Sequence, residues 1–161
     1  NAGISPKADD GGRLSSLTTD LETWQQVTQV NFYAPIMLAR GLLDELCQAK
    51  GSVVNVTSIA GSRVHMFAGT AYATSKAALA SLTREMAADF APLGVRVNAI
   101  APGEINTEIL SPETEELLVP TIPMRRLGTP EEVAKTIYFL CTEQSSYVNG
   151  AEIHINGGQH V

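Results

Sequence analysis

The sequence predicts an α/β fold in which a parallel sheet carries helices on both of its faces. Short β-branched runs alternate along the chain with longer amphipathic stretches of helical period, and the connections between them are short. This alternation is typical of parallel strands that are joined by right-handed helical crossovers. With 161 residues, of which 44% are apolar and 17% charged, the chain has the length and composition of one globular domain.

The first helix is expected to begin at the capping-box pattern Thr19-Asp20-Leu21-Glu22 and to continue to about Ala49. Gly51 ends this helix. The β-branched run at 52–57 follows and is bounded by turn residues, which predicts a strand buried on both faces.

The second helix is predicted by the Ala-rich stretch from Ala71 to Ala91, whose larger apolar residues have helical spacing. Pro92 and Gly94 stop it. Residues 95–100 form the second predicted strand, which closes on Pro102-Gly103.

The segment 104–128 contains three prolines, and we expect a mobile cover with a weak helix near 113–119 rather than a core element. The run Thr129-Pro130-Glu131-Glu132 supplies the N-cap, the first-position proline and the capping-box glutamate of a third helix. That helix is expected to end near Thr142. Residues 151–155 form the last predicted strand.

The charge and the histidine spacing exclude several classes of function. A formal net charge of −6, without a cluster of Lys or Arg, disfavours nucleic-acid partners. No apolar run approaches the roughly 18 residues of a membrane helix, and the first ten residues lack an export pattern, so we expect a cytoplasmic protein without a membrane partner. His65, His154 and His160 lack the spacing of a zinc site, so we expect no bound metal.

Tyr72 and Lys76 are four residues apart in a predicted helix, which places both side chains on one face. A free tyrosine has a pKa of about 10 and is a poor acid or base at neutral pH, but a nearby positive charge lowers that pKa. Lys76 is therefore expected to lower the pKa of Tyr72 and make the phenol a usable proton donor and acceptor. Taken alone, the same spacing also fits an ordinary surface pair.

Further polar residues follow the predicted strands. Ser58 follows the first strand, residues 102–107 follow the second, and Asn1-Ala2-Gly3 is expected to follow a strand that the sequence does not contain. Open α/β sheets present ligand-binding groups at the carboxyl ends of their strands. These groups, together with the start of the helix that carries Tyr72, are therefore expected to face one crevice.

This combination resembles the short-chain dehydrogenase/reductase family over nearly the whole chain. Asn1-Ala2-Gly3 is similar to the end of the family's Asn-Asn-Ala-Gly motif, and Asn31, Ser58, Tyr72 and Lys76 are similar to its catalytic tetrad. The chain is also similar to the single-domain branch that includes 3-oxoacyl-acyl-carrier-protein reductases. The resemblance implies that residues 1–161 form the carboxyl-terminal two thirds of one Rossmann-type domain. The cofactor-binding residues that it implies are Asn1, Gly3, Tyr72, Lys76, Pro102, Gly103, Ile105 and Thr107.

The sequence departs from the family because it contains no Thr-Gly-x-x-x-Gly-x-Gly phosphate loop, which in the family precedes the Asn-Asn-Ala-Gly motif. Roughly the first third of the family's fold is missing. The residue that would choose between a ribose hydroxyl and a ribose phosphate is missing with it, so NAD and NADP are not distinguished. These 161 residues alone are therefore expected to have no catalytic activity.

The resemblance implies transfer of a hydride between the nicotinamide and the carbon of a carbonyl or alcohol substrate. Tyr72 would act as general acid and base, Ser58 and Tyr72 would bind the substrate oxygen, and Lys76 would hold the nicotinamide ribose. Asn31 would anchor a water chain that returns protons to Tyr72.

Two other functions stay open. The chain could be a non-catalytic relative or fragment that acts only through subunit contacts, since it lacks the phosphate loop. A serine–lysine hydrolase would use Ser58 or Ser75 with Lys76, although Ser75 points to a different helix face and no oxyanion-hole glycines surround it. Members of the family usually form homo-tetramers or homo-dimers through two long helices, here residues 22–49 and 72–91.

The substrate is expected to be a small molecule, with an acyl or small hydrophobic carbonyl compound favoured over a sugar. The expected pocket walls are residues 64–69 and 109–127. Their apolar lining comprises Met66, Phe67, Leu117, Leu118, Ile122 and Met124.

Pro35 leads to an expectation that comes from helix geometry. Proline has no N–H, so in a continuous helix Pro35 leaves the carbonyl of Asn31 without its partner and bends the helix there. We expect this freed carbonyl, more than the side-chain amide, to accept a hydrogen bond from the relay water. The alternative is a tolerated kink whose carbonyl faces bulk water.

Overall fold

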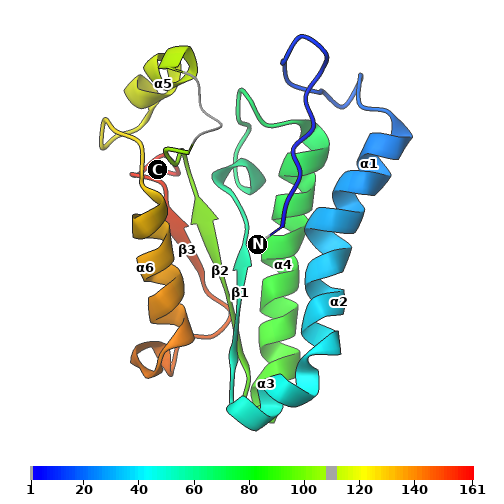
Figure 1. Ribbon diagram of the computed structural model, residues 1–161, viewed down its shortest axis with the longest axis vertical. Helices are drawn as coiled ribbons and strands as arrows, with labels where there is room; N and C mark the ends of the chain where they lie inside the picture. Colours follow the sequence, from blue (N-terminus) through cyan, green and yellow to red (C-terminus); the bar gives the residue numbers. More distant parts are fainter. Residues whose placement is uncertain (1, 108–111) are drawn as a thin grey trace.

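The computed structural model describes residues 2–107 and 112–161, without the side chains of 112–114. Its centre is a three-stranded parallel sheet in the order β1-β2-β3 (Figure 1). The strands are β1 (Ser52–Val56), β2 (Arg96–Pro102) and β3 (Glu152–Ile155). The predicted α/β fold with a parallel sheet is confirmed.

The register places the carboxyl ends of the strands together. Val56 of β1 pairs with Ile100, and Pro102 at the end of β2 pairs with Ile155 at the end of β3. Residues that directly follow these strands therefore meet at one edge of the sheet.

Helices cover both faces of the sheet, as predicted (Figure 1). One face carries α4 (Thr70–Phe90), against which α1 (Leu21–Thr28) packs, and α2 (Ala34–Gly41) lies beside them. The opposite face carries α6 (Pro130–Cys141), which begins with the predicted capping box at Thr129 and Glu132.

The core lies mainly between α4 and β2. Met86 and Phe90 of α4 pack with Val95 and Val97, and all four side chains are buried. The small alanines of α4 let the helix approach the sheet closely, while its larger apolar residues fill the space between them.

The first helical region extends from Leu21 to Ala49, close to the predicted bounds, but it is not α-helical throughout. A π-helical turn (Gln29–Tyr33) separates α1 from α2, and the Ala34 N–H bonds the Gln29 carbonyl, five residues back. The chain then bends again before α3 (Leu43–Ala49). The N-cap also differs by one residue: Asp20 accepts a hydrogen bond from Thr23 N at 2.7 Å, whereas Thr19 bonds the Ser15 carbonyl.

The predicted weak helix after β2 is present as α5 (Pro112–Leu118), followed by the 3-10 turn Val119–Thr121. Three apolar residues of the expected cover, Leu118, Ile122 and Leu127, are at most 7% exposed. The prediction that this segment contributes nothing to the core is therefore wrong. None of the helices in the described part of the chain combines the length and apolarity needed to span a membrane.

Candidate active site

Ser58 lies directly after β1, where the sequence places it. Its backbone is extended, and its Oγ caps the short 3-10 helix η2 (Ile59–Gly61) by accepting a hydrogen bond from Ala60 N at 3.2 Å. This bond fixes the direction of the hydroxyl, whose own proton remains able to point toward a ligand.

Gly61 allows η2 to lie against the backbone of α4. A Cβ built at Gly61 would be 2.9 Å from Ala77 N and 3.0 Å from the Lys76 carbonyl carbon. No side chain fits in that space. The absence of a Cβ at this position therefore brings Ser58 and the first turns of α4 close together.

Tyr72 lies in the first turn of α4 and lines, together with Ser58, one cavity of about 740 Å³. Burial raises the pKa of the Tyr72 phenol, the neighbouring Ser58 side chain acts in the lowering direction, and the Glu104 carboxylate raises the pKa again. The net direction is upward. The prediction that Lys76 lowers the pKa of Tyr72 is therefore wrong for this structure.

Lys76 explains that difference. Its side chain is only 5% exposed, and its Nζ donates a hydrogen bond to the Val56 carbonyl at 2.7 Å rather than to the phenol. The ammonium lies over the face of the Tyr72 ring, 5.6 Å from the ring centroid. Burial lowers the pKa of Lys76.

Asn31 is buried inside the π-helical turn and joins three segments. Its Oδ1 accepts from Ile4 N at 2.9 Å, and its Nδ2 donates to the Ile4 carbonyl at 2.9 Å and to Ser75 Oγ at 3.1 Å. Ser75 Oγ in turn donates to the Tyr72 carbonyl at 2.7 Å. Both amide protons of Asn31 are therefore used in holding the N-terminal segment against the start of α4.

These contacts also decide against a hydrolase that uses Ser75. The hydroxyl of Ser75 is 5% exposed and is engaged with Asn31 and the Tyr72 carbonyl, so it is not available as a nucleophile. The Lys76 ammonium is directed to Val56.

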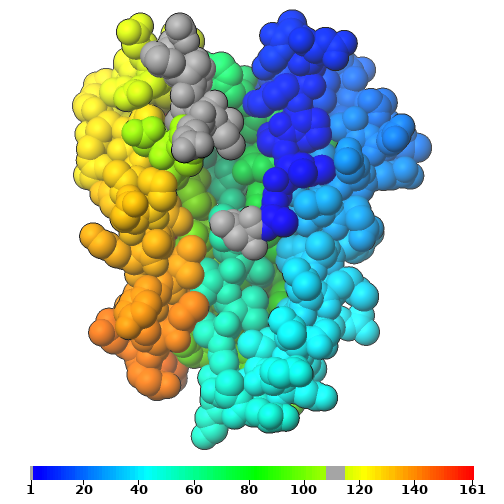
Figure 2. All heavy atoms as spheres, viewed as in Figure 1, coloured from blue at the N-terminus to red at the C-terminus, as the bar shows by residue number. Residues whose placement is uncertain are grey.

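Gly3 lies next to Asn31 and Lys76. A Cβ at this position would be 3.6 Å from both Asn31 Oδ1 and Lys76 Nζ. The N-terminal segment, dark blue in Figure 2, runs exposed along this face of the molecule. Asn1 lies outside the described residues.

Pro102 and Gly103 end β2 as predicted. The packing around Gly103 also requires a residue without a side chain. A Cβ at Gly103 would lie 2.5 Å from Gln159 Oε1 and 2.6 Å from Asn156 Cβ. Gly103 therefore lets the β2 end approach the turn that follows β3.

Ile105 forms an isolated parallel bridge with Gly128, and the Asn106 N–H bonds the Gly128 carbonyl at 2.8 Å. This bridge ties the loop after β2 to the start of α6. Thr107, the last described residue before the gap, is exposed.

The predicted apolar pocket is only partly observed. Phe67 and Leu118 line the Ser58–Tyr72 cavity, whereas Ile122 and Met124 line a separate cavity of about 330 Å³. Met66 and Leu117 are 59% and 62% exposed. Part of the expected wall, residues 108–111, lies outside the described residues. The lining of the Ser58–Tyr72 cavity is apolar over much of its surface, as predicted, but it is built only partly from the residues expected.

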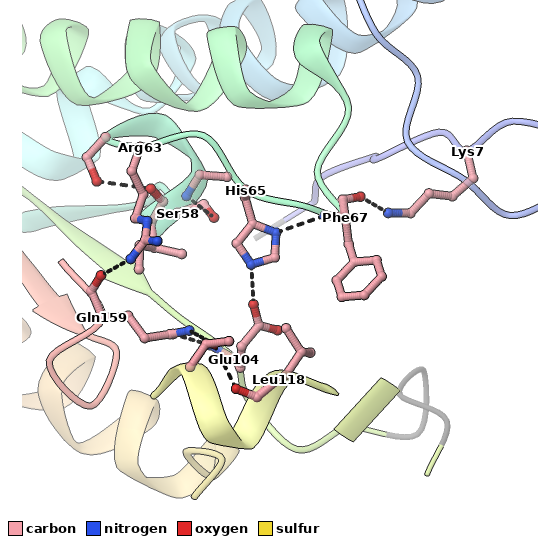
Figure 3. Close-up of polar contacts among 12 residues, drawn as sticks. Lys7, Ser58, Arg63, His65, Phe67, Glu104, Leu118 and Gln159 are labelled. Carbon is pink, nitrogen blue, oxygen red and sulfur yellow. Dashed lines mark hydrogen bonds and ion pairs between the residues drawn. The ribbon is translucent and has the colours of Figure 1, made fainter. Parts of the chain in front are cut away.

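Charged side chains that the sequence analysis did not single out face the same cavity. The lining includes Lys7, His65 and Glu104 (Figure 3). His65 Nε2 lies 2.6 Å from Glu104 Oε1, and each of the two side chains is 14% exposed. A carboxylate directly after Pro102-Gly103 was a visible signal for Glu104, but nothing in the sequence pairs it with His65. Among the described residues, no group of three or more His, Cys, Asp or Glu side chains is placed to hold a metal ion.

A family model described as Enoyl-(Acyl carrier protein) reductase matches residues 1–160. A solved oxidoreductase of the short chain dehydrogenase/reductase family from Brucella ovis, in complex with a partially ordered NAD, is 66% identical with a TM-score of 0.80. The alignment covers 97% of this chain and 62% of that one. The chain belongs to the short-chain dehydrogenase/reductase family.

Two more proteins are similar to this chain over its whole length. Protein FixR of Bradyrhizobium diazoefficiens is 66% identical over 161 residues, which are 100% of this chain and 58% of that protein. A 3-oxoacyl-[acyl-carrier protein] reductase from Brucella melitensis is 34% identical with a TM-score of 0.94, over 100% of this chain and 61% of the other. The chain thus spans less than two thirds of the length of these relatives.

The site residues of this short-chain dehydrogenase/reductase chain fit the nicotinamide end of a dinucleotide. An ammonium has three N–H donors, and the structure shows one bond from Lys76, to Val56. Ribose hydroxyls would offer this buried cation further acceptors, which favour its charged form. Gly3 brings the N-terminal segment next to the Lys76 ammonium. The chain contains no glycine-rich loop for the pyrophosphate.

Proposed function

We propose that the protein is an oxidoreductase that interconverts a carbonyl and an alcohol with NAD or NADP. The observation that carries this proposal is the cavity shared by Ser58 and Tyr72, with the buried Lys76 ammonium over the face of the tyrosine ring. Solved relatives hold NAD or NADP, which supports a nicotinamide cofactor without choosing between the two.

The bound nicotinamide supplies a hydride to the carbonyl carbon, or accepts one from the alcohol carbon. Tyr72 gives its phenol proton to the carbonyl oxygen during reduction, so that hydride and proton together convert the C=O bond into a C–H and an O–H. Ser58 donates a hydrogen bond to the same oxygen and orients it. In oxidation, Tyr72 takes the alcohol proton back.

Lys76 and Asn31 support Tyr72 in this proposal. Lys76 holds the ribose and places a positive charge over the face of the phenol ring. Asn31 uses both amide protons on Ile4 and Ser75, so its backbone carbonyl is the group offered to a water that returns protons to Tyr72. Catalytic tests require a form of the protein in which a dinucleotide-binding segment accompanies residues 1–161, which we call the cofactor-binding form.

Replacing Pro35 with alanine is expected to slow turnover in the cofactor-binding form. Pro35 occupies the second position of α2, directly after the π-helical turn that contains Asn31. Alanine supplies an N–H that favours an α-helical bond to the Asn31 carbonyl and removes that carbonyl from the proton relay. Stability is expected to rise or stay constant, since alanine is the better helix former.

Steady-state turnover across pH, together with thermal unfolding, checks this expectation. Pro130→Ala is the matched control because Pro130 opens α6 on the opposite face of the sheet. Unchanged turnover of Pro35→Ala at every pH would remove the assigned role of the Asn31 carbonyl and leave Pro35 as a tolerated residue.

The 161-residue chain alone is expected to bind neither NADH nor NADPH with micromolar affinity. It offers the dinucleotide only the nicotinamide-end contacts, because no glycine-rich loop is present to hold the pyrophosphate. Calorimetric titration of the purified chain with each cofactor measures this directly. Micromolar binding with turnover would show that the phosphate site is dispensable.

The alternative function is a non-catalytic protein that acts through subunit contacts. It is supported by an apolar groove of about 280 Å³ between α2 and β1, whose lining includes Leu38, Leu46 and Val53. A strand or helix could pack there. Homo-tetramers or homo-dimers through α1–α3 and α4 are the assembly we propose for either function. Tyr72-dependent turnover of the cofactor-binding form supports the enzyme, and its absence supports the alternative.

A further inference from the structure

Three separate parts of the chain contribute polar or aromatic side chains to the wall of the cavity beside Tyr72. The N-terminal segment contributes Lys7, the loop after η2 contributes His65 and Phe67, and the end of β2 contributes Glu104. Lining side chains of both charges therefore surround the reactive hydroxyls of Ser58 and Tyr72. A charged ligand would offer these groups further partners, whereas an apolar ligand would remove their remaining hydration without compensation.

Glu104 is held in place by its neighbours. Its carbonyl accepts from the Gly128 N–H at 2.9 Å, and its carboxylate pairs with His65 at 2.6 Å. His65 Nδ1 accepts a hydrogen bond from the Phe67 N–H at 3.3 Å, which assigns the imidazole proton to Nε2. A neutral imidazole donating to a carboxylate leaves one negative charge on the pair, at a site where 86% of each side chain is covered.

The Glu104 carboxylate acts in the raising direction on the pKa of both Tyr72 and Lys7. Burial is the main reason that the pKa of Tyr72 is raised, and the Glu104 carboxylate adds to the increase. Burial lowers the pKa of Lys7, and the same carboxylate acts in the opposite direction. A cation bound at Glu104 would offset its effect on Tyr72 while it stabilises the carboxylate.

Lys7 supplies the opposite charge. Figure 3 shows its side chain reaching the loop 65–67, where Nζ donates to the Phe67 carbonyl, while Glu104 contacts the same loop through His65. An ammonium has two more donors than this one bond uses. A carboxylate on a ligand is the partner that would stabilise the Lys7 ammonium most strongly.

We propose that the substrate of the Ser58–Tyr72 site carries both an ammonium and a carboxylate, as a small hydroxy- or oxo-amino acid does. Glu104 binds the ammonium, Lys7 binds the carboxylate, and the hydroxyl or carbonyl lies at Ser58 and Tyr72. This inference rests on the proposed oxidoreductase function. In the oxidation direction the alcohol carbon loses a hydride to the oxidised nicotinamide, Tyr72 takes the hydroxyl proton, and the amino and carboxylate groups are unchanged.

Four secondary alcohols that share one reacting group test each charge separately. Threonine carries both charged groups, 1-amino-2-propanol only the ammonium, 3-hydroxybutyrate only the carboxylate, and 2-propanol neither. In the cofactor-binding form, threonine is expected to have the highest kcat/KM of the four and 2-propanol the lowest.

Two variants assign the charges to their residues. Glu104→Gln keeps an acceptor for His65 and is expected to lower kcat/KM roughly 10- to 150-fold for the two amino compounds, the range for losing a charged hydrogen bond, and little for the others. Lys7→Gln is expected to have the same effect on the two carboxylates only. Glu131→Gln and Lys135→Gln, on exposed positions of α6, are matched controls that should change none of the four.

The outcomes separate this inference from the proposed function. An equal fall in kcat/KM for all four alcohols in Glu104→Gln overturns the inference. A kcat/KM for 2-propanol as high as that for threonine also overturns it. Neither result contradicts the proposed oxidoreductase function. If other alcohols are turned over in a Tyr72-dependent way but none of these four is, the inference is overturned and the proposed function is kept. If no alcohol or carbonyl compound is turned over, the proposed function fails, and the inference that rests on it fails with it.

Discussion

Replacing Tyr72 with phenylalanine is expected to lower kcat by about 10²- to 10⁴-fold, the range for removing a general acid–base group. Phenylalanine keeps the ring that lines the cavity and lies under the Lys76 ammonium, so cofactor affinity should stay close to normal. Stopped-flow turnover and cofactor titration of the cofactor-binding form measure the two quantities separately. Tyr138→Phe is the matched control, since Tyr138 is 70% exposed on α6.

Lys76→Ala is expected to differ from Tyr72→Phe in one respect. It removes both the charge beside the phenol and the proposed ribose contact, so kcat should fall and the cofactor Kd should rise roughly 10- to 150-fold, as expected for lost charged hydrogen bonds. Equal loss of cofactor affinity in the two variants would contradict this division of roles.

The direction of the Tyr72 shift predicts a pH dependence. Burial is the largest cause that raises the pKa of the phenol above its usual value, so Tyr72 carries its proton at neutral pH. A protonated phenol is ready to donate, which favours reduction of a carbonyl near pH 7. Oxidation needs the phenolate, so its rate is expected to rise with increasing pH, and this rise should be lost in Tyr72→Phe.

Gly61→Ala is expected to damage both stability and catalysis. The added methyl group would lie 2.9 Å from Ala77 N and 3.0 Å from the Lys76 carbonyl carbon, and both are backbone atoms that cannot rotate away. Overpacking of this kind costs typically about 1–3 kcal/mol. Relief requires η2 to move from α4, which separates Ser58 from Tyr72, and a misplacement of about 1 Å costs about 10²-fold in rate.

Thermal unfolding and kcat of the cofactor-binding form measure the two effects of Gly61→Ala. Gly41→Ala is the matched control because nothing lies within 4 Å of its Cβ position at the end of α2. Alanine there should leave stability unchanged or raise it, since it lowers the entropy of the unfolded chain. A Gly61→Ala protein as stable and active as the control would show that η2 and α4 do not need their close contact.

The sequence was sufficient for those parts of the fold that local chemistry decides. The capping box at Thr129 and the β-branched runs of β1 and β2 specify their elements through nearby residues alone. The placement of Ser58 and Tyr72 in one cavity also followed, because parallel strands bring their carboxyl ends together.

Other features depend on contacts between distant residues and were missed for that reason. The π-helical turn allows Asn31 to reach Ile4, 27 positions away, and no helical propensity records that bond. The pairing of His65 with Glu104 is equally non-local. The upward pKa shift of Tyr72 depends first on its burial, whereas the spacing to Lys76 indicated only the possible partner.

The bonds of Asn31 have a consequence for how the protein opens. Amide protons in an exposed segment usually exchange with solvent quickly, because such segments open locally at little cost in free energy. The amide of Ile4 is instead held by a side chain that is 1% exposed and that also binds Ser75 of α4. We therefore expect the N-terminal segment, the π-helical turn and the start of α4 to open as one cooperative unit. The order of the N-terminal segment and that of the helix that carries Tyr72 would then be gained and lost together.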